Sequence, residues 1–107
     1  MLDQNIVARC ERCRGAYKPD ITFFGEMLPE AALEEAIQWS KEADLMIVLG
    51  TSLTVHPAAS LPLQTLRAGG DLIIINAQPT PLDRKAIRCY SDLVAFSTAI
   101  TDTYPAP

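Results

Sequence analysis

Apolar residues in this chain gather in short continuous runs that alternate with helical patterns. Residues 45–49 and 72–75 are unbroken apolar runs, and they end at Gly50 and Asn76. Runs of this kind are typical of strands that are buried on both faces of a parallel sheet. The pattern therefore predicts a central strand at 45–49, a second strand at 72–75 and a third at 93–96.

Helical signals separate these strands. Residues 30–43 carry apolar or small side chains at the spacing of one helical face, and Pro29 suits the first helical position. A second helix is predicted at 57–67, where Pro62 interrupts or kinks it, and a short helix or turn at 81–88. Strands that alternate with helices imply right-handed βαβ units and a doubly wound, mostly parallel α/β sheet.

The N-terminal part has a different character. Residues 1–20 follow neither a period of two nor one of 3.6, so this stretch is predicted to be irregular. Residues 21–24 then form a short β-prone run that is closed by Gly25.

Composition and charge exclude several classes of protein. The chain is 49% hydrophobic and 21% charged, which indicates a folded globular protein and not a disordered segment. Its formal net charge of −4 offers no basic stripe for nucleic acid. The start lacks the pattern of a signal peptide, and no apolar stretch approaches the ~18 residues of a membrane span, so a cytoplasmic protein is expected.

The cysteines favour metal binding over disulfides. Three are present, and two of them form the pair Cys10-x-x-Cys13, while Cys89 lies far away in the sequence. An odd number with one close pair does not match a secreted disulfide framework. Thiolates at this spacing can both reach one zinc ion, which takes about four ligands.

Taken in order, several segments resemble the second half of a sirtuin, the family of NAD-dependent protein lysine deacylases. These segments are the cysteine pair, residues 18–29 (KPDITFFGEMLP), residues 43–58 with the run GTSLTVHPA, and the IIN of residues 74–76. The resemblance covers nearly all of residues 10–96. The ordered set is specific, although a lone CxxC or GTS is common.

The resemblance implies an NAD-binding role for polar turns at the ends of the predicted strands. The first turn would contact the NAD phosphates and ribose, the second would hold the adenosine ribose, and a serine beside Asp92 would lie near the adenine. The implied residues are Gly50, Thr51, Ser52, Asn76, Ala77, Gln78 and Ser91. The alternative is that these are ordinary loop residues, since Gly, Ser and Asn favour turns in any protein.

The resemblance also implies a clamp for an acyl-lysine peptide, formed by two edges that pair with the peptide main chain. Phe24 would line the acyl-lysine tunnel. At the position of Thr22, the family usually has an aliphatic residue. The implied residues are Thr22, Phe24, Gly25, Glu26, Leu53, Thr54 and Val55. Alternatively, Phe23 and Phe24 are simply core residues.

Two features of the family have no counterpart in this sequence. The resemblance implies a Gly-rich phosphate loop and a catalytic histidine, both upstream of the cysteine pair. The single histidine of this sequence, His56, lies before Pro57 at a position that varies in the family. It is expected to be a surface or groove residue. Cys10 and Cys13 would be half of a zinc site whose other cysteine pair is upstream. Zinc is therefore expected to be absent from an isolated monomer, or shared between two chains.

These expectations combine into one reading of the chain. Residues 1–18 would be the remnant of a zinc-binding module, 19–98 the C-terminal half of a Rossmann-like NAD-binding domain, and 99–107 a tail. The chain would be the C-terminal portion of a deacetylase or deacylase that transfers an acyl group to ADP-ribose, and it would be inactive alone.

Two rival hypotheses remain at this point. In the first, the chain is a stand-alone, non-catalytic nucleotide- or peptide-binding module that acts as a homodimer, because a half sheet leaves an apolar edge exposed. Alternatively, a separate chain carries the missing half, and the two assemble into one enzyme.

Overall fold

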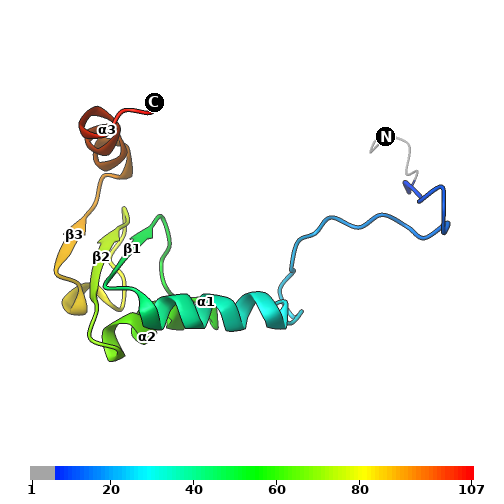
Figure 1. Cartoon of the computed structure of the whole chain (residues 1–107), viewed down its shortest axis with the longest axis horizontal. Helices are drawn as coiled ribbons and strands as arrows, with labels where there is room; N and C mark the ends of the chain where they lie inside the picture. The colour runs from blue at the N-terminus through cyan, green and yellow to red at the C-terminus, as the bar shows by residue number, and fades with distance from the viewer. Residues whose placement is uncertain (1–6) are drawn as a thin grey trace.

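The computed structural model describes residues 7–107 and contains a three-stranded parallel sheet (Figure 1). The strands are β1 (Leu45–Leu49), β2 (Asp71–Ile75) and β3 (Arg88–Tyr90), and they lie side by side in that order. All five residues of β1 pair with β2, and the three residues of β3 pair with the second half of β2. This arrangement confirms the predicted α/β class.

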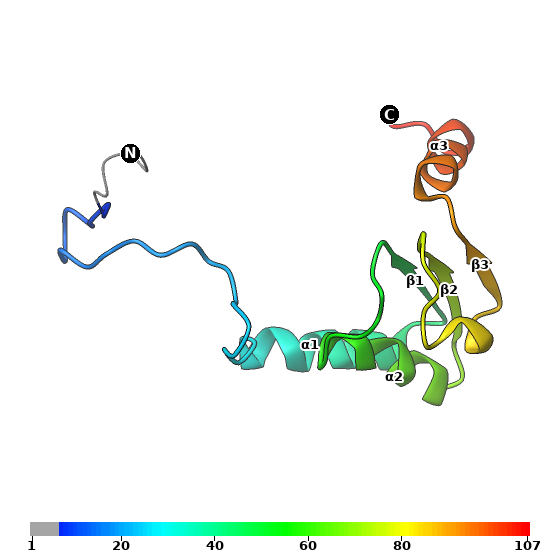
Figure 2. The same cartoon turned by 180° about the vertical axis from the view of Figure 1, so that it is seen from behind.

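Two α-helices form a layer against the sheet. α1 (Glu30–Glu42) packs along α2 (Leu61–Arg67), and α2 in turn contacts β1 and β2 (Figures 1 and 2). Short 3-10 helices, η2 (Ala58–Ser60) and η3 (Asp83–Lys85), lie in the connections. The helices predicted at 30–43 and 57–67 are thus confirmed, the second as a 3-10 turn that continues into α2.

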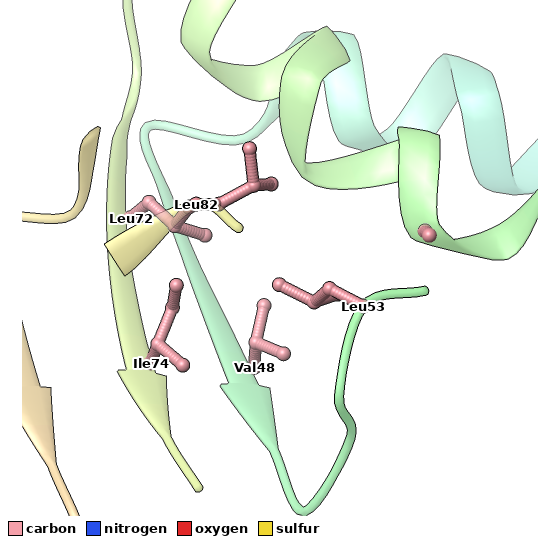
Figure 3. Close-up of a cluster of buried hydrophobic side chains, with 6 residues drawn as sticks. Val48, Leu53, Leu72, Ile74 and Leu82 are labelled. Atoms are coloured by element: carbon pink, nitrogen blue, oxygen red, sulfur yellow. The ribbon is translucent and has the colours of Figure 1, made fainter. Parts of the chain in front are cut away.

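The hydrophobic core lies between the sheet and these helices. Figure 3 shows side chains from β1, from β2 and from two loops pointing toward one another. The buried members of the cluster are Val48, Leu53, Ala59, Leu72, Ile74 and Leu82. A buried hydrogen bond ties the two helices together, because the Thr65 hydroxyl donates to the Ser40 carbonyl over 2.6 Å.

The third strand was predicted at the wrong place. Residues 93–96 begin a helix, α3 (Leu93–Thr103), while β3 precedes them. The Asp92 carboxylate accepts a hydrogen bond of 2.9 Å from the Ala95 N–H, which satisfies one of the free donors of the first helical turn. α3 also continues past residue 99, where the tail was expected to begin.

The prediction that residues 45–49 form a central strand buried on both faces was also wrong. β1 is an edge strand in this sheet. Val48 is only 7% exposed, whereas Leu45, Ile47 and Leu49 on the other face are 44%, 47% and 52% exposed. The helices cover one face of β1, and α3 lies beyond the carboxyl ends of the strands (Figure 2).

The segment before α1 contains no regular strand from residue 7 onward. The predicted strand at 21–24 is irregular backbone followed by a turn, and Gly25 has a φ of 85° in that turn. The predicted metal-binding module at 1–18 begins outside the described residues, which start at 7. Of the helices in the described part, none has both the length and the apolar character that crossing a bilayer requires.

Candidate functional site

The carboxyl ends of the three strands lie side by side at one end of the sheet. The N–H of Gly50, just after β1, donates to the Ile75 carbonyl over 2.8 Å, and the N–H of Asn76, just after β2, donates to the Tyr90 carbonyl over 3.0 Å. Ser91 follows β3 directly. The turns that were predicted to bind the cofactor are therefore neighbours in space, in the position where open α/β sheets bind ligands.

A small cavity of about 260 Å³ opens beside the second and third of these turns. The Asn76 side chain is half-buried there, and its amide donates to the Gln78 carbonyl over 3.0 Å. Four of the predicted cofactor residues are among those that line it, namely Asn76, Ala77, Gln78 and Ser91. Cys89 and Tyr90 line it as well, and the sequence analysis missed both because it placed the third strand after them.

A larger cavity, of about 540 Å³, lies between the segment before α1 and the loop after β1. Its wall is mostly apolar, and Phe24 projects freely with 93% of its surface exposed. The Lys18 ammonium lies 3.2 Å from the Glu26 carboxylate at its rim. Five of the seven predicted peptide-binding residues line this cavity: Thr22, Phe24, Gly25, Glu26 and Val55.

The other two predicted peptide-binding residues lie elsewhere. The Leu53 side chain is buried in the core, and the Thr54 hydroxyl hydrogen bonds to that of Ser52 over 2.8 Å. Sequence reasoning missed several further lining residues, although the helical face of α1 was a signal for one of them. The missed residues are Met27, Leu28, Leu33, Pro57 and Ala58. His56 lines the cavity too, as expected for a groove residue.

Comparison with known proteins decides the family. The family model described as "Sir2 family" matches residues 1–57. An NAD-dependent protein deacetylase from Thermotoga maritima is 48% identical over 102 residues, which is 94% of this chain and 42% of the relative. The chain belongs to the Sir2 family. A second Sir2 relative, NAD-dependent protein deacetylase 1 from Pyrobaculum aerophilum, is 48% identical over 75 residues, or 70% of this chain and 30% of that protein.

Solved Sir2 structures share the fold. A structure described as Sir2 bound to acetylated peptide has a TM-score of 0.84 at 48% identity, over 95% of this chain and 43% of that one. A Sir2–p53 peptide–NAD+ complex has a TM-score of 0.83 at 48% identity, over 95% of this chain and 43% of that one. The chain thus spans about two fifths of the length of these Sir2 proteins and corresponds to their C-terminal part.

The cysteine pair of this Sir2 chain lies on a tight turn. Arg9 and Ala16 form an isolated antiparallel bridge, and inside it the N–H of Arg14 donates to the Cys10 carbonyl over 2.9 Å. A Cβ on Gly15 would lie only 3.3 Å from the Cys13 sulfur, so the turn closely fits a glycine. Within residues 7–107, no three or more His, Cys, Asp or Glu side chains come together in a way that could hold a metal ion.

The Cys10 thiol should react at lower pH than the Cys89 thiol. The N–H groups of Cys13 and Arg12 beside the sulfur lower the pKa of Cys10 to about 7, whereas desolvation and the Asp83 carboxylate raise the pKa of Cys89. Because the thiolate is the nucleophile, alkylation of metal-free protein by iodoacetamide should level off just above neutral pH at Cys10 and continue to rise at Cys89. Peptide mass spectrometry across a pH series measures both rates, and identical profiles would contradict the assignment.

Proposed function

We propose that this chain supplies two binding surfaces of a Sir2-type NAD-dependent protein deacetylase, one for the adenosine side of NAD and one for an acyl-lysine peptide. The proposal rests above all on the position of Gly50, Asn76 and Ser91 directly after three adjacent strands. The N–H groups of Gly50 and Asn76 fix this position, because each donates to the last residue of the next strand. A nucleotide is long enough to contact several such turns at once.

The cofactor surface offers hydrogen-bond donors and no carboxylate in its first two turns. Gly50, Thr51 and Ser52 would contact the phosphates and ribose, as anions favour donor-rich turns. Because the N–H of Gly50 already donates to the Ile75 carbonyl, the donors would be the backbone N–H groups and hydroxyls of Thr51 and Ser52. Asn76, with Ala77 and Gln78, would hold the adenosine ribose, and Ser91 would lie near the adenine. NAD, when bound, supplies the ADP-ribose that accepts the acyl group.

The peptide surface is apolar and bordered by exposed main chain. The segment 22–26 and the loop residues 53–55 would each pair with the peptide backbone, a mode of binding that depends little on the peptide sequence. The inward direction of the Leu53 side chain is compatible with this role, because main-chain pairing does not use the side chain. The exposed Phe24 ring is suited to an uncharged acyl group.

Replacing Asn76 by alanine should weaken ADP-ribose binding about tenfold, which corresponds to the loss of about 1.4 kcal/mol of hydrogen bonding. Isothermal titration of the chain with ADP-ribose measures the change. Gln38→Ala is the matched control, because this exposed amide lies on α1 and donates to the Glu42 carboxylate over 2.7 Å, so its loss should leave the affinity unchanged. A wild-type chain with no ADP-ribose affinity would argue against the cofactor surface.

The same proposal extends to zinc. Cys10 and Cys13 would supply two ligands of a structural zinc ion, and the other ligands would come from outside this pair. The close fit of Gly15 under Cys13 supports this role. Where two chains share the ion, zinc should slow the alkylation of Cys10 and Cys13 and leave that of Cys89 unchanged.

A further inference from the structure

Leu53 is the single buried residue in the loop that joins β1 to η2. Within residues 50–57 it alone is buried, with 7% of its surface exposed, and its neighbours on both sides are exposed. Its side chain leaves the loop and points toward Val48 and the rest of the core cluster (Figure 3). The loop is therefore anchored to the body of the protein at its midpoint.

The backbone of Leu53 is sterically unfavourable. Its φ of 56° lies in the left-handed region, where a leucine Cβ crowds the following carbonyl group. A residue holds such a conformation only when its surroundings enforce it, and these residues concentrate at functional sites. Here the enforcing interaction is the burial of the side chain, so the loop conformation depends on that burial.

The loop has two arms, residues 50–52 and residues 54–57, on either side of Leu53, and hydrogen bonds fix each arm. On the cofactor side, the N–H of Gly50 is bonded to β2, and the Thr51 hydroxyl accepts from the Leu53 N–H over 3.3 Å. On the peptide side, the Val55 carbonyl accepts from the Ala59 N–H over 2.9 Å, and the His56 ring hydrogen bonds to the Ser60 hydroxyl over 2.8 Å. Leu53 is the residue that both arms share.

We propose that Leu53 is a positioning residue that preforms both surfaces of the loop at once, the cofactor turn at 50–52 and the peptide wall at 54–57. This inference rests on the proposed function. With Leu53 seated in the core, both surfaces are ready and each ligand binds without ordering the loop. When the Leu53 side chain leaves the core, both surfaces lose their order together. The first ligand then binds with lower affinity, because its binding must also reorder the loop.

The decisive experiment compares Leu53→Ala with Val48→Ala in the whole chain. Both residues belong to the same core cluster and are 7% exposed, but only Leu53 lies in the loop. Titrations use ADP-ribose, a short acetyl-lysine peptide, and each of these in the presence of saturating amounts of the other. Circular dichroism at the same temperature verifies that each variant is folded.

Leu53→Ala should weaken the binding of both ligands about tenfold, and a saturating amount of either ligand should restore most of the affinity for the other. Val48→Ala should leave both affinities within about twofold of wild type, and wild type should show little mutual enhancement. A loss confined to one ligand, or a joint loss without mutual restoration, overturns the inference while leaving the proposed function intact. If wild type binds neither ligand, both fall.

Hydrogen exchange of the wild-type chain provides a second measurement that needs no folded variant. The hydrogen-bonded amides of Gly50 and Ala59, on opposite sides of the anchor, should become exposed in one opening event with the same protection factor. That protection should be lower than that of Ile74 in the central strand, which is 1% exposed. Clearly different protection of the two arms means that Leu53 does not position them jointly.

Discussion

Truncation of Leu72 to alanine should lower the free energy of unfolding by about 3 kcal/mol, a typical cost for removing most of a buried leucine side chain. Leu72 has no exposed surface, and its strand is paired on both sides. Its carbonyl also accepts a hydrogen bond of 2.8 Å from the Ile87 N–H. The backbone around the space left by the missing leucine atoms is thus held on both sides and has little freedom to collapse into that space.

Urea unfolding followed by circular dichroism measures this loss. Leu45→Ala is the matched control, because it removes the same atoms from a side chain that is 44% exposed on the uncovered face of β1. Its cost should stay below about 1 kcal/mol. Similar losses for the two variants would mean that the core does not lie where the structure places it.

Alanine at Gly70 should cost about 2 to 3 kcal/mol through overpacking. An added Cβ would lie 2.6 Å from the Ala43 carbonyl oxygen and 2.7 Å from the Thr65 Cγ2 atom. The first of these neighbours is backbone and the second belongs to a fully buried side chain, so neither yields easily. The turn before β2 would have to move away from the end of α1.

Gly69→Ala separates this clash from backbone strain. Gly69 has a φ of 93° but nothing within 4 Å of its added Cβ, so only the strain of the left-handed backbone remains, at about 1 kcal/mol. Thermal unfolding of the two variants should therefore give the larger loss of stability at Gly70. The reverse order would contradict the close approach of this turn to α1.

The sequence predicted the elements whose signals are local. The helix at 30–43 and the strands at 45–49 and 72–75 have clear apolar patterns, and all three are present. Residues 93–96 were wrongly predicted as a strand because a run of four apolar residues fits a strand or a helix equally well. Asp92 was the missing clue, since an aspartate directly before such a run is a common helix N-cap.

Burial was harder to predict because it depends on neighbours that are distant in sequence. The apolar run of β1 does not reveal that Leu45 and Ile47 lack a covering layer, which depends on strand order and helix placement. Likewise, Leu53 was assigned to the peptide surface from its position in a motif. Its side chain instead belongs to the core cluster with Leu72 and Ile74, which are distant in the sequence.

The order of the strands determines what each part of the chain contributes. β2 pairs beside β1, and β3 pairs beside β2, so the strands lie in the sheet in the same order as in the sequence. A chain shortened from its C-terminus would lose α3 first and then Ser91 and β3, and with these two one wall of the cavity beside Asn76. The peptide groove and the Leu53 anchor depend only on earlier residues. Such progressive shortening would therefore remove the adenosine end of the nucleotide site while the peptide groove was still intact.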